Sequence, residues 1–94
     1  MIPWKSKDGE KNKDIRIFAL STCGWCKKTK QYFDDLGVEY HYVDVDVLNG
    51  EELAEVEQEV KKWNPIESYP TIVIGQSETV LGYNKDKIEE VLEI

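Results

Sequence analysis

Apolar residues recur along the chain with different spacings, and each spacing predicts a different element. Residues 15 to 20 are almost continuously apolar, which is typical of a strand buried on both faces of a sheet. Beyond them, side chains suited to a buried helix face follow at steps of three and four: Cys26, Thr29, Phe33 and Leu36. This period predicts a helix over residues 25 to 36. Gly37 stands where a helix end favours a left-handed residue.

The next part of the chain repeats the change from strand to helix. Residues 38 to 46 alternate and are rich in Val and Tyr, which predicts a second strand, joined to the first by the helix as a βαβ unit. Asn49 and Glu52 have the spacing of a capping box at a helix start. The apolar stripe of this second helix consists of Leu53, Val56, Val60 and Trp63. Asn64 and Pro65 are expected to end it.

Two short strands and a helix complete the pattern. Residues 71 to 74 predict a third strand, residues 75 to 78 a turn and residues 79 to 81 a fourth strand, which together form a hairpin. Gly82 breaks this pattern, and Asn84 is expected to cap a third helix. The apolar face of that helix consists of Ile88, Val91 and Leu92.

The order of these elements predicts an α/β fold. It reads βαβ, helix, ββα, with a central four-stranded mixed sheet and three helices. Residues 1–14 show no hydrophobic period, so we expect a flexible N-terminal arm followed by one domain over residues 15–94. Ile2, Pro3 and Trp4 are the apolar residues that would attach the beginning of the arm to the domain.

Composition and charge narrow the class of protein. A chain of 94 residues is one small domain. No apolar run approaches the roughly 20 residues that span a bilayer, and the start lacks the apolar stretch of a signal peptide. We therefore expect a cytoplasmic protein without a membrane partner. The net charge of -7 argues against a nucleic-acid partner, because phosphates require clustered basic residues.

The two cysteines, Cys23 and Cys26, have three possible roles: a metal site, a structural disulfide or a redox pair. A zinc site takes four ligands, and His41 is the only histidine, so we expect no metal site. A structural disulfide at this spacing would close too short a loop to constrain the unfolded chain. A redox pair remains, because close cysteines in a reducing compartment are more often catalytic than structural.

The expected position of the pair at a helix start suits redox chemistry. Unpaired backbone N–H groups and the helix dipole stabilise an anion there, and a thiolate is such an anion. We expect Cys23 to attack a substrate disulfide and Cys26, one turn further along, to resolve the mixed disulfide. Lys27, Lys28 and Lys30 either add favourable charge and attract anionic substrates or form a solvated helix face; the sequence leaves both open. 

Two carboxylates near the end of the second strand have a simpler interpretation. Asp44 and Asp46 share a face at strand spacing. Paired carboxylates are able to perform acid-base chemistry, but these two are expected to end the strand and solvate the following loop.

At this point the residues resemble the glutaredoxin and thioredoxin-like redoxin family, specifically a glutaredoxin-like protein. The resemblance covers residues 15 to 92. It depends on the Cys-Gly-Trp-Cys motif after a strand, the acidic end of the second strand, the Tyr69-Pro70-Thr71 step and Gly82 before the last helix. It implies a thioredoxin fold, a thiol-disulfide oxidoreductase, protein disulfides or a low-molecular-weight thiol as partners, and a cis bond at Pro70 against the cysteines.

The resemblance also implies a binding site for substrate, with glutathione as a possible co-substrate. Its residues would be Gly24, Trp25, Lys27, Tyr69, Pro70, Gly82, Tyr83 and Asn84. Many glutaredoxins carry a Lys shortly before the first cysteine, where this chain has Leu20-Ser21-Thr22. The stretch from Leu81 to Asp86 is closer to redoxins that a thioredoxin reductase reduces. Glutathione and such a reductase therefore both remain as electron sources.

Gly24 replaces the proline that is commoner between the two cysteines. Some glutaredoxins with a small residue there hold a [2Fe-2S] cluster between two subunits, which makes a cluster carrier the alternative function. The main interpretation is a monomer without a resident cofactor. Trp25 is expected to be exposed beside the pair, as an apolar contact for substrates or as an ordinary surface aromatic.

Overall fold

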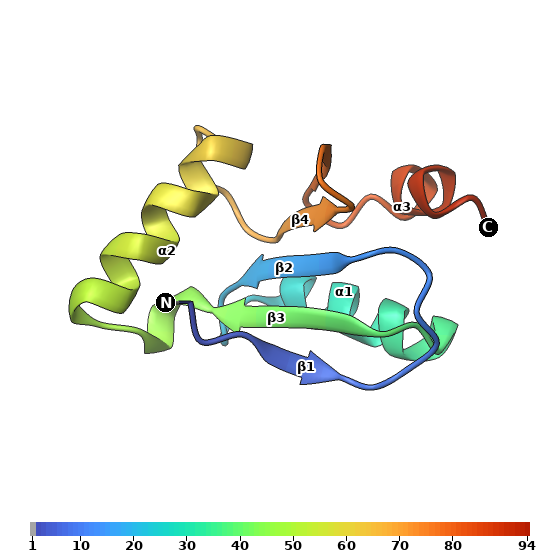
Figure 1. Ribbon diagram of the computed structural model, residues 1–94, viewed down its shortest axis with the longest axis horizontal. Helices are drawn as coiled ribbons and strands as arrows, with labels where there is room; N and C mark the ends of the chain where they lie inside the picture. The colour runs from blue at the N-terminus through green and yellow to red at the C-terminus, as the bar shows by residue number, and fades with distance from the viewer. Residues whose placement is uncertain (1) are drawn as a thin grey trace.

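Strand β2 (Ile15–Ala19) lies at the centre of a mixed five-stranded sheet with the order β1-β3-β2-β4-β5. The computed structural model describes residues 2–94 (Figure 1). The pairing of β2 with β3 is parallel, and the other three pairings are antiparallel. The remaining elements are β1 (Lys5–Lys7), α1 (Gly24–Leu36), β3 (Tyr40–Asp44), the 3-10 turn η1 (Val45–Val47), α2 (Gly50–Trp63), β4 (Thr71–Ile74), β5 (Glu78–Leu81) and α3 (Lys85–Leu92).

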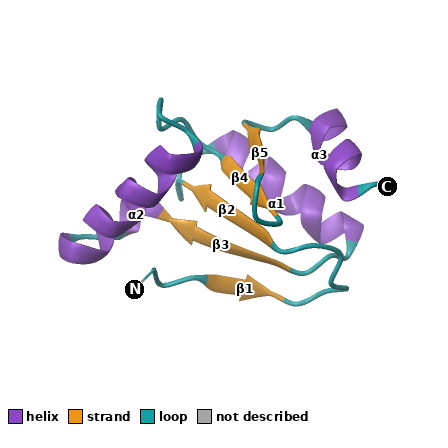
Figure 2. Ribbon diagram, turned by 45° about the horizontal axis from the view of Figure 1, so that its top comes forward, coloured by secondary structure: helices purple, strands orange, loops and turns teal. Residues whose placement is uncertain are grey.

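Helices cover both faces of the sheet, because alternate residues of the central strands point to opposite sides. Ile15 and Ile17 of β2 belong to a core cluster with residues of α1 and α3, whereas Phe18 belongs to a second cluster with residues of α2. In β4, Ile72 lies in the first cluster and Val73 in the second. The nearly continuous apolar runs thus reflect strands buried on both faces, as the sequence predicts. Figure 2 shows helices on the two sides of the sheet.

The expected four-stranded sheet is wrong by one strand. Strand β1 comes from the segment expected to be an arm, and it pairs with the edge of β3, with Lys5 opposite Tyr42. Gly9, which follows β1, lies directly against the backbone of Val38: a Cβ on Gly9 would be 2.5 Å from it. The ring of Trp4 packs against Phe18 with 5.1 Å between the centroids. Residues 2–10 therefore contact the domain both at the β3 edge of the sheet and in the cluster on its α2 face.

The helix ends follow the predicted signals with one exception. Gly37 adopts φ 70° at the end of α1, and the side chain of Asn84 accepts the N–H of Lys87 at the start of α3, both as predicted. Asn49 occupies the cap position of α2, but its side chain makes no capping hydrogen bond, so the predicted capping box is wrong. Strand β3 ends at Asp44, two residues before the predicted end.

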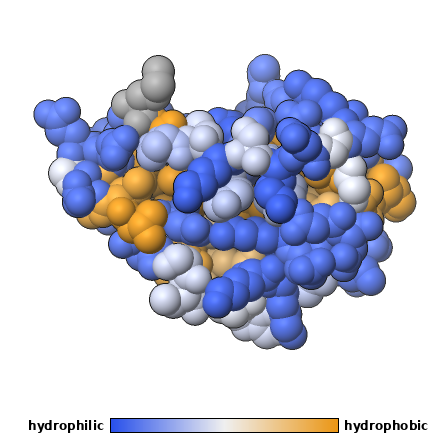
Figure 3. All heavy atoms as spheres, turned by 90° about the horizontal axis from the view of Figure 1, so that it is seen from below, coloured by the Kyte–Doolittle hydropathy of each residue, from blue (hydrophilic) through white to orange (hydrophobic). Residues whose placement is uncertain are grey.

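The surface is mostly polar. Figure 3 shows one face on which hydrophilic side chains cover most of the area and apolar surface is confined to separate patches. The large apolar side chains that are exposed are Trp25, Val47, Ile66, Leu81 and Ile94. Among residues 2–94, none of the helices is long and apolar enough to cross a membrane.

Candidate active site

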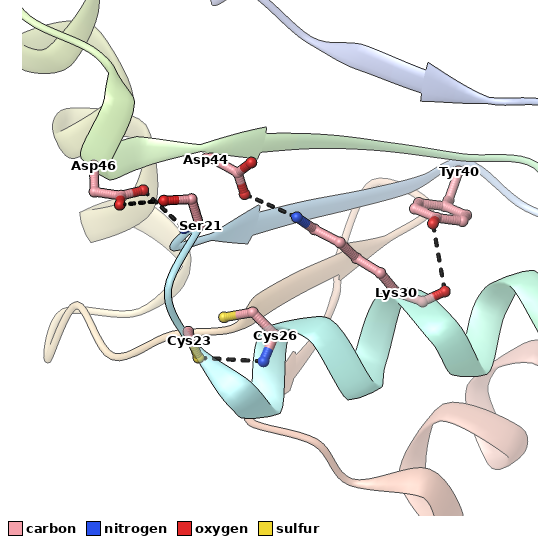
Figure 4. Close-up of polar contacts among 7 residues, drawn as sticks. All are labelled: Ser21, Cys23, Cys26, Lys30, Tyr40, Asp44 and Asp46. Carbon is pink, nitrogen blue, oxygen red and sulfur yellow. Dashed lines mark hydrogen bonds and ion pairs between the residues drawn. The ribbon is translucent and has the colours of Figure 1, made fainter.

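Cys23 caps helix α1 with its own sulfur. Its backbone is extended, with φ -82° and ψ 119°, and its Sγ accepts the N–H of Cys26 at 3.2 Å (Figure 4). Ser, Thr, Asp and Asn usually perform this role, so the sulfur occupies the place of a hydrogen-bonding oxygen. The Cys23 sulfur therefore lies at the positive end of the helix dipole. The two cysteines are free thiols.

Cys26 lies beneath Cys23 and is inaccessible. Its exposed fraction is 0%, and it belongs to the core cluster that also contains Phe33. Burial raises the pKa of the Cys26 thiol to about 12, and the neighbouring Cys23 sulfur adds to the rise. The thiol therefore stays protonated at neutral pH in this state. An incoming disulfide is able to reach Cys23 but not Cys26.

The loop between β2 and α1 is tied to the 3-10 turn η1. The backbone N–H of Ser21 donates to the Asp46 carboxylate at 2.8 Å, and the Ser21 hydroxyl donates to the same carboxylate at 2.6 Å. These two hydrogen bonds lower the pKa of Asp46 below its usual value. The expectation that Asp46 only solvates a loop is therefore incomplete, because it fixes the segment that leads to Cys23.

Asp44 is also engaged. Its carboxylate lies 2.9 Å from the Nζ of Lys30, and the side chains are 16% and 20% exposed, respectively. The same Nζ lies 4.2 Å from the centre of the Tyr42 ring. Lys30 therefore belongs to a partly buried ion pair, which decides against the solvated-face interpretation for this one of the three lysines.

The second wall of the site is the loop that ends at Pro70. The bond between Tyr69 and Pro70 is cis, as the resemblance implies. A polar network supports this loop: the amide of buried Asn64 donates to the Ser68 carbonyl at 3.1 Å and to the Thr71 hydroxyl at 3.0 Å. The carbonyl of Pro70 accepts the N–H of Gly82 at 2.9 Å.

A pocket of about 230 Å³ lies between this loop and helix α1. It is lined by Trp25, Tyr69, Pro70, Gly82 and Tyr83. Trp25 is 58% exposed, as expected, and stacks on Tyr83 with 6.0 Å between the ring centroids. Burial is the main cause that raises the pKa of Tyr69, and nearby carboxylates add to it, so the phenol is neutral at physiological pH.

A wider hollow of about 360 Å³ lies between α1 and α3, next to Tyr83. Tyr83 lines both, and the other lining residues are Lys28, Gln31, Tyr32, Asp35 and Lys85. The Nζ of Lys28 lies 4.9 Å from the centre of the Trp25 ring. Lys28 and Lys85 therefore place positive charge beside an aromatic surface that begins next to the cysteine pair.

Comparison with known proteins gives the family. A family model described as glutaredoxin matches residues 15–78, about two thirds of the chain. The chain belongs to the glutaredoxin family. The match begins with β2 and includes the two cysteines, the helix that carries them and the Tyr69-Pro70 step. This agrees with the resemblance and with the thioredoxin-like fold expected from it.

Solved glutaredoxin structures support the same assignment. The chain is 38% identical to the glutaredoxin of Methanosarcina mazei Go1, with a TM-score of 0.89 over 97% of this chain and 88% of that one. It is 38% identical to the methanoredoxin of Methanosarcina acetivorans, with a TM-score of 0.87 over 92% of this chain and 90% of that one. A glutaredoxin-like 8.6 kDa protein encoded in a rubredoxin operon of Clostridium pasteurianum is 33% identical over 84% of this chain and 97% of its own.

The structure of this glutaredoxin brings most of the predicted site residues together. Cys23, Cys26 and the five residues of the smaller pocket lie around one end of the sheet. Gly24 is the first residue of α1, between the cysteines. Two residues lie differently from the rest. Lys27 is exposed and does not line the pocket, and the side chain of Asn84 caps α3.

Some side chains that shape the site have no signal in the sequence. Ser21 and Asp46 meet only because β2 and β3 are parallel neighbours, and Asn64 reaches Thr71 across a loop. Tyr32, on α1, lines the wider hollow, but it is not one of the residues of the apolar stripe that predicts the helix. The sequence does indicate that Lys30 lies near Cys26, because a residue four positions further along a helix lies on the same face.

Proposed function

We propose that this glutaredoxin is a thiol-disulfide oxidoreductase that reduces protein disulfides or mixed disulfides of glutathione through a reversible Cys23–Cys26 disulfide. The observation that carries the proposal is the asymmetry of the pair. Cys23 is partly exposed with its Sγ at a helix N-terminus, and Cys26 is fully buried one turn along. Only one sulfur is open to a substrate, and the other is close enough to replace it.

Two exchange steps follow from this arrangement. The Cys23 thiolate attacks one sulfur of the substrate disulfide, forms a mixed disulfide and releases the other sulfur as a thiolate. The Cys26 sulfur then attacks Cys23, loses its proton and expels the second substrate thiolate. The substrate gains two electrons and the protein is left with a disulfide. A dithiol reductase or two molecules of a thiol must supply two electrons to restore it.

The pocket suggests how a substrate is held. Trp25 and Tyr83 offer apolar contact area, and the backbone of Tyr69 is available to an extended chain beside the cysteines. None of the five lining residues is charged. A glutathione carboxylate would therefore need Lys28, Lys85 or Lys27 nearby, so we keep a thioredoxin-reductase-like enzyme as the alternative electron source.

The roles of the cysteines predict distinct outcomes for two variants. Cys23→Ser is expected to abolish disulfide exchange, because no exposed thiol remains. Cys26→Ser is expected to accumulate a mixed disulfide on Cys23, because nothing resolves it. Mass spectrometry of alkylated samples after reaction with a disulfide substrate distinguishes these states. A Cys26→Ser protein that never carries an adduct would refute the assigned roles.

The electron source is tested by equilibrating the oxidised protein across a series of reduced-to-oxidised glutathione ratios. A midpoint near roughly -200 to -230 mV with a glutathione adduct on Cys23 supports glutathione as co-substrate. An intact disulfide without adduct points to a reductase or another small thiol.

The alternative function, a [2Fe-2S] carrier, requires cysteine sulfur that is able to bind a cluster. Among residues 2–94, no three His, Cys, Asp or Glu side chains lie together as a ligand set. Cys26 is fully buried, so Cys23 is the sulfur able to reach a cluster shared with a second subunit. A brown, dimeric protein that loses its colour in Cys23→Ser would support the carrier function. The proposed oxidoreductase is a colourless monomer of a reducing compartment such as the cytoplasm.

A further inference from the structure

The second exchange step needs a thiolate at Cys26, and the reduced protein disfavours it. Burial and the adjacent Cys23 sulfur both oppose ionisation of this thiol. When Cys23 enters a mixed disulfide it carries no negative charge, so its opposition falls. Burial remains, and a buried thiolate needs a nearby positive charge or hydrogen-bond donor to form at neutral pH.

Lys30 is placed to supply that charge. It follows Cys26 by four residues in α1, so the two side chains lie one turn apart on the same helix face. Figure 4 shows the Lys30 side chain extending from α1 toward the end of β3, with its Nζ on the Asp44 carboxylate. Burial raises the pKa of Cys26; a backbone hydrogen bond from Leu20 lowers it, and the charge of Lys30 lowers it further.

The surroundings keep Lys30 in this place. Its side chain is 20% exposed, its Nζ is 2.9 Å from Asp44, and it lies over the Tyr42 ring. A charge screened so little by water acts further than a surface lysine does. The Asp44 carboxylate limits the movement of the ammonium, while it offsets part of the positive charge.

The other groups around Cys26 do not replace Lys30. Cys23 approaches from the loop after β2, and Tyr69 approaches from the loop before β4 with a neutral phenol. The backbone of Leu20 also favours the ionised thiol through a hydrogen bond. Asp46, on η1, is engaged by Ser21. Among the described residues, Lys30 thus places a positive charge in a partly buried position, one helical turn along α1 from the resolving cysteine.

We propose that Lys30, held by Asp44, is a positioning residue that promotes ionisation of Cys26 and thereby speeds resolution of the mixed disulfide. The proposal rests on the proposed oxidoreductase function. In the step itself, Cys26 releases its proton to water, its sulfur bonds to the Cys23 sulfur, and the bond from Cys23 to the substrate sulfur breaks. The departing thiolate carries the electron pair of that bond and takes up a proton.

A stopped-flow reaction with 5,5'-dithiobis(2-nitrobenzoate) separates the two steps. Attack by Cys23 releases a first coloured thiolate, and resolution by Cys26 releases a second. The variants are Lys30→Met, which keeps an unbranched side chain without the charge, Lys30→Gln, and Lys30→Arg, which keeps the charge. Lys7→Met is the matched control, because it removes an exposed lysine from strand β1.

Lys30→Met and Lys30→Gln are expected to slow the second release at pH 7 by about tenfold and to move its pH midpoint up by about one unit, since a tenfold loss of thiolate equals one pKa unit. The first release should change by less than about threefold, and Lys30→Arg should restore the second. Lys7→Met should match the parent protein. 

An unchanged pH midpoint in both uncharged variants would overturn the proposal, as would equal slowing of both releases, which is what a purely structural ion pair gives. If Lys30→Met does not fold, Lys30→Gln and Lys30→Arg still decide the result. Failure of the proposed function itself looks different: the parent protein would give no second release and no Cys23–Cys26 disulfide.

Discussion

At the scale of single residues, the site depends on which atoms are held and which are reachable. The Cys23 sulfur has two roles, because it caps helix α1 and is the proposed nucleophile. Its position depends on the preceding loop, which Asp46 fixes through two hydrogen bonds from Ser21. A carboxylate that accepts both a backbone N–H and a hydroxyl makes charge-assisted bonds, which are stronger than neutral ones.

Asp46→Asn tests this contact through pH. The folded protein lowers the pKa of Asp46, so the stabilisation is complete above the ordinary carboxyl value of about 3.9 and is lost as pH falls through the folded value. We expect the variant to be less stable than the parent at pH 7 and the difference to shrink below about pH 3.9. Urea unfolding across pH measures both.

The same variant should slow attack by Cys23 by about three- to tenfold, because a loosened loop places the reacting sulfur less well. Asp8→Asn is the control, since Asp8 is an exposed carboxylate on the N-terminal segment. A stability difference that stays constant from pH 7 to pH 2.5 would contradict the role of Asp46.

At the scale of elements, signals local to a few residues predicted well, and signals that need the tertiary fold did not. The stop at Asn64 and the cap at Asn84 are local, and both are confirmed. The capping box failed at Asn49, whose side chain makes no capping hydrogen bond; the next residue, Gly50, adopts φ 60°. The hydrogen bonds of the Asn64 side chain to Ser68 and Thr71 could not be predicted from the sequence, because only the fold of the following loop brings these residues together.

Asn64→Ala tests how far that loop depends on one amide. Asn64 is fully buried, and its side chain bonds Ser68 and Thr71 and accepts the N–H of Ile66. Removing it leaves the Thr71 hydroxyl and the Ser68 carbonyl, among the described residues, with only their hydrogen bond to each other, so we expect a loss of about 1–3 kcal/mol in the free energy of unfolding. The Michaelis constant for a disulfide substrate should rise as well, because the loop carries Tyr69 and Pro70.

Urea unfolding and steady-state kinetics check the two effects of Asn64→Ala. Gln76→Ala is the control, because Gln76 is exposed in the turn between β4 and β5 and is expected to change the free energy of unfolding by less than about 0.5 kcal/mol. Asn64→Ala with parental stability would show that the loop does not depend on the network.

At the scale of the whole molecule, the sheet includes a strand that lies outside the part of the chain matched by the family model. The match to the family model begins at residue 15, and β1, which lies before it, adds one strand to the sheet on the β3 side. Sequence reasoning missed β1 because Lys5–Lys7 are all exposed and carry no apolar alternation. The pairing instead depends on the backbone, on Trp4 against Phe18 and on Gly9, which fits where no side chain would.

Two tryptophans allow a paired test of this extension. Trp4 is half-buried against Phe18 in the cluster on the α2 face, whereas Trp25 is 58% exposed at the pocket. Trp4→Ala is expected to lower the free energy of unfolding by about 1–3 kcal/mol, less than a fully buried aromatic costs, with exchange activity retained. Trp25→Ala should do the reverse, with a raised Michaelis constant and a stability change of less than about 1 kcal/mol.

Urea unfolding and steady-state disulfide exchange are measured on both variants. We expect Trp4→Ala to lower stability and keep activity, and Trp25→Ala to keep stability and raise the Michaelis constant. If Trp4→Ala leaves stability unchanged, the N-terminal residues do not contribute to the fold, and the domain is residues 15–94 with a dispensable arm. If both variants lose stability together, the pocket and the sheet edge are one cooperative unit, and substrate bound against Trp25 should then stabilise the contact of Trp4 with Phe18 by mass action.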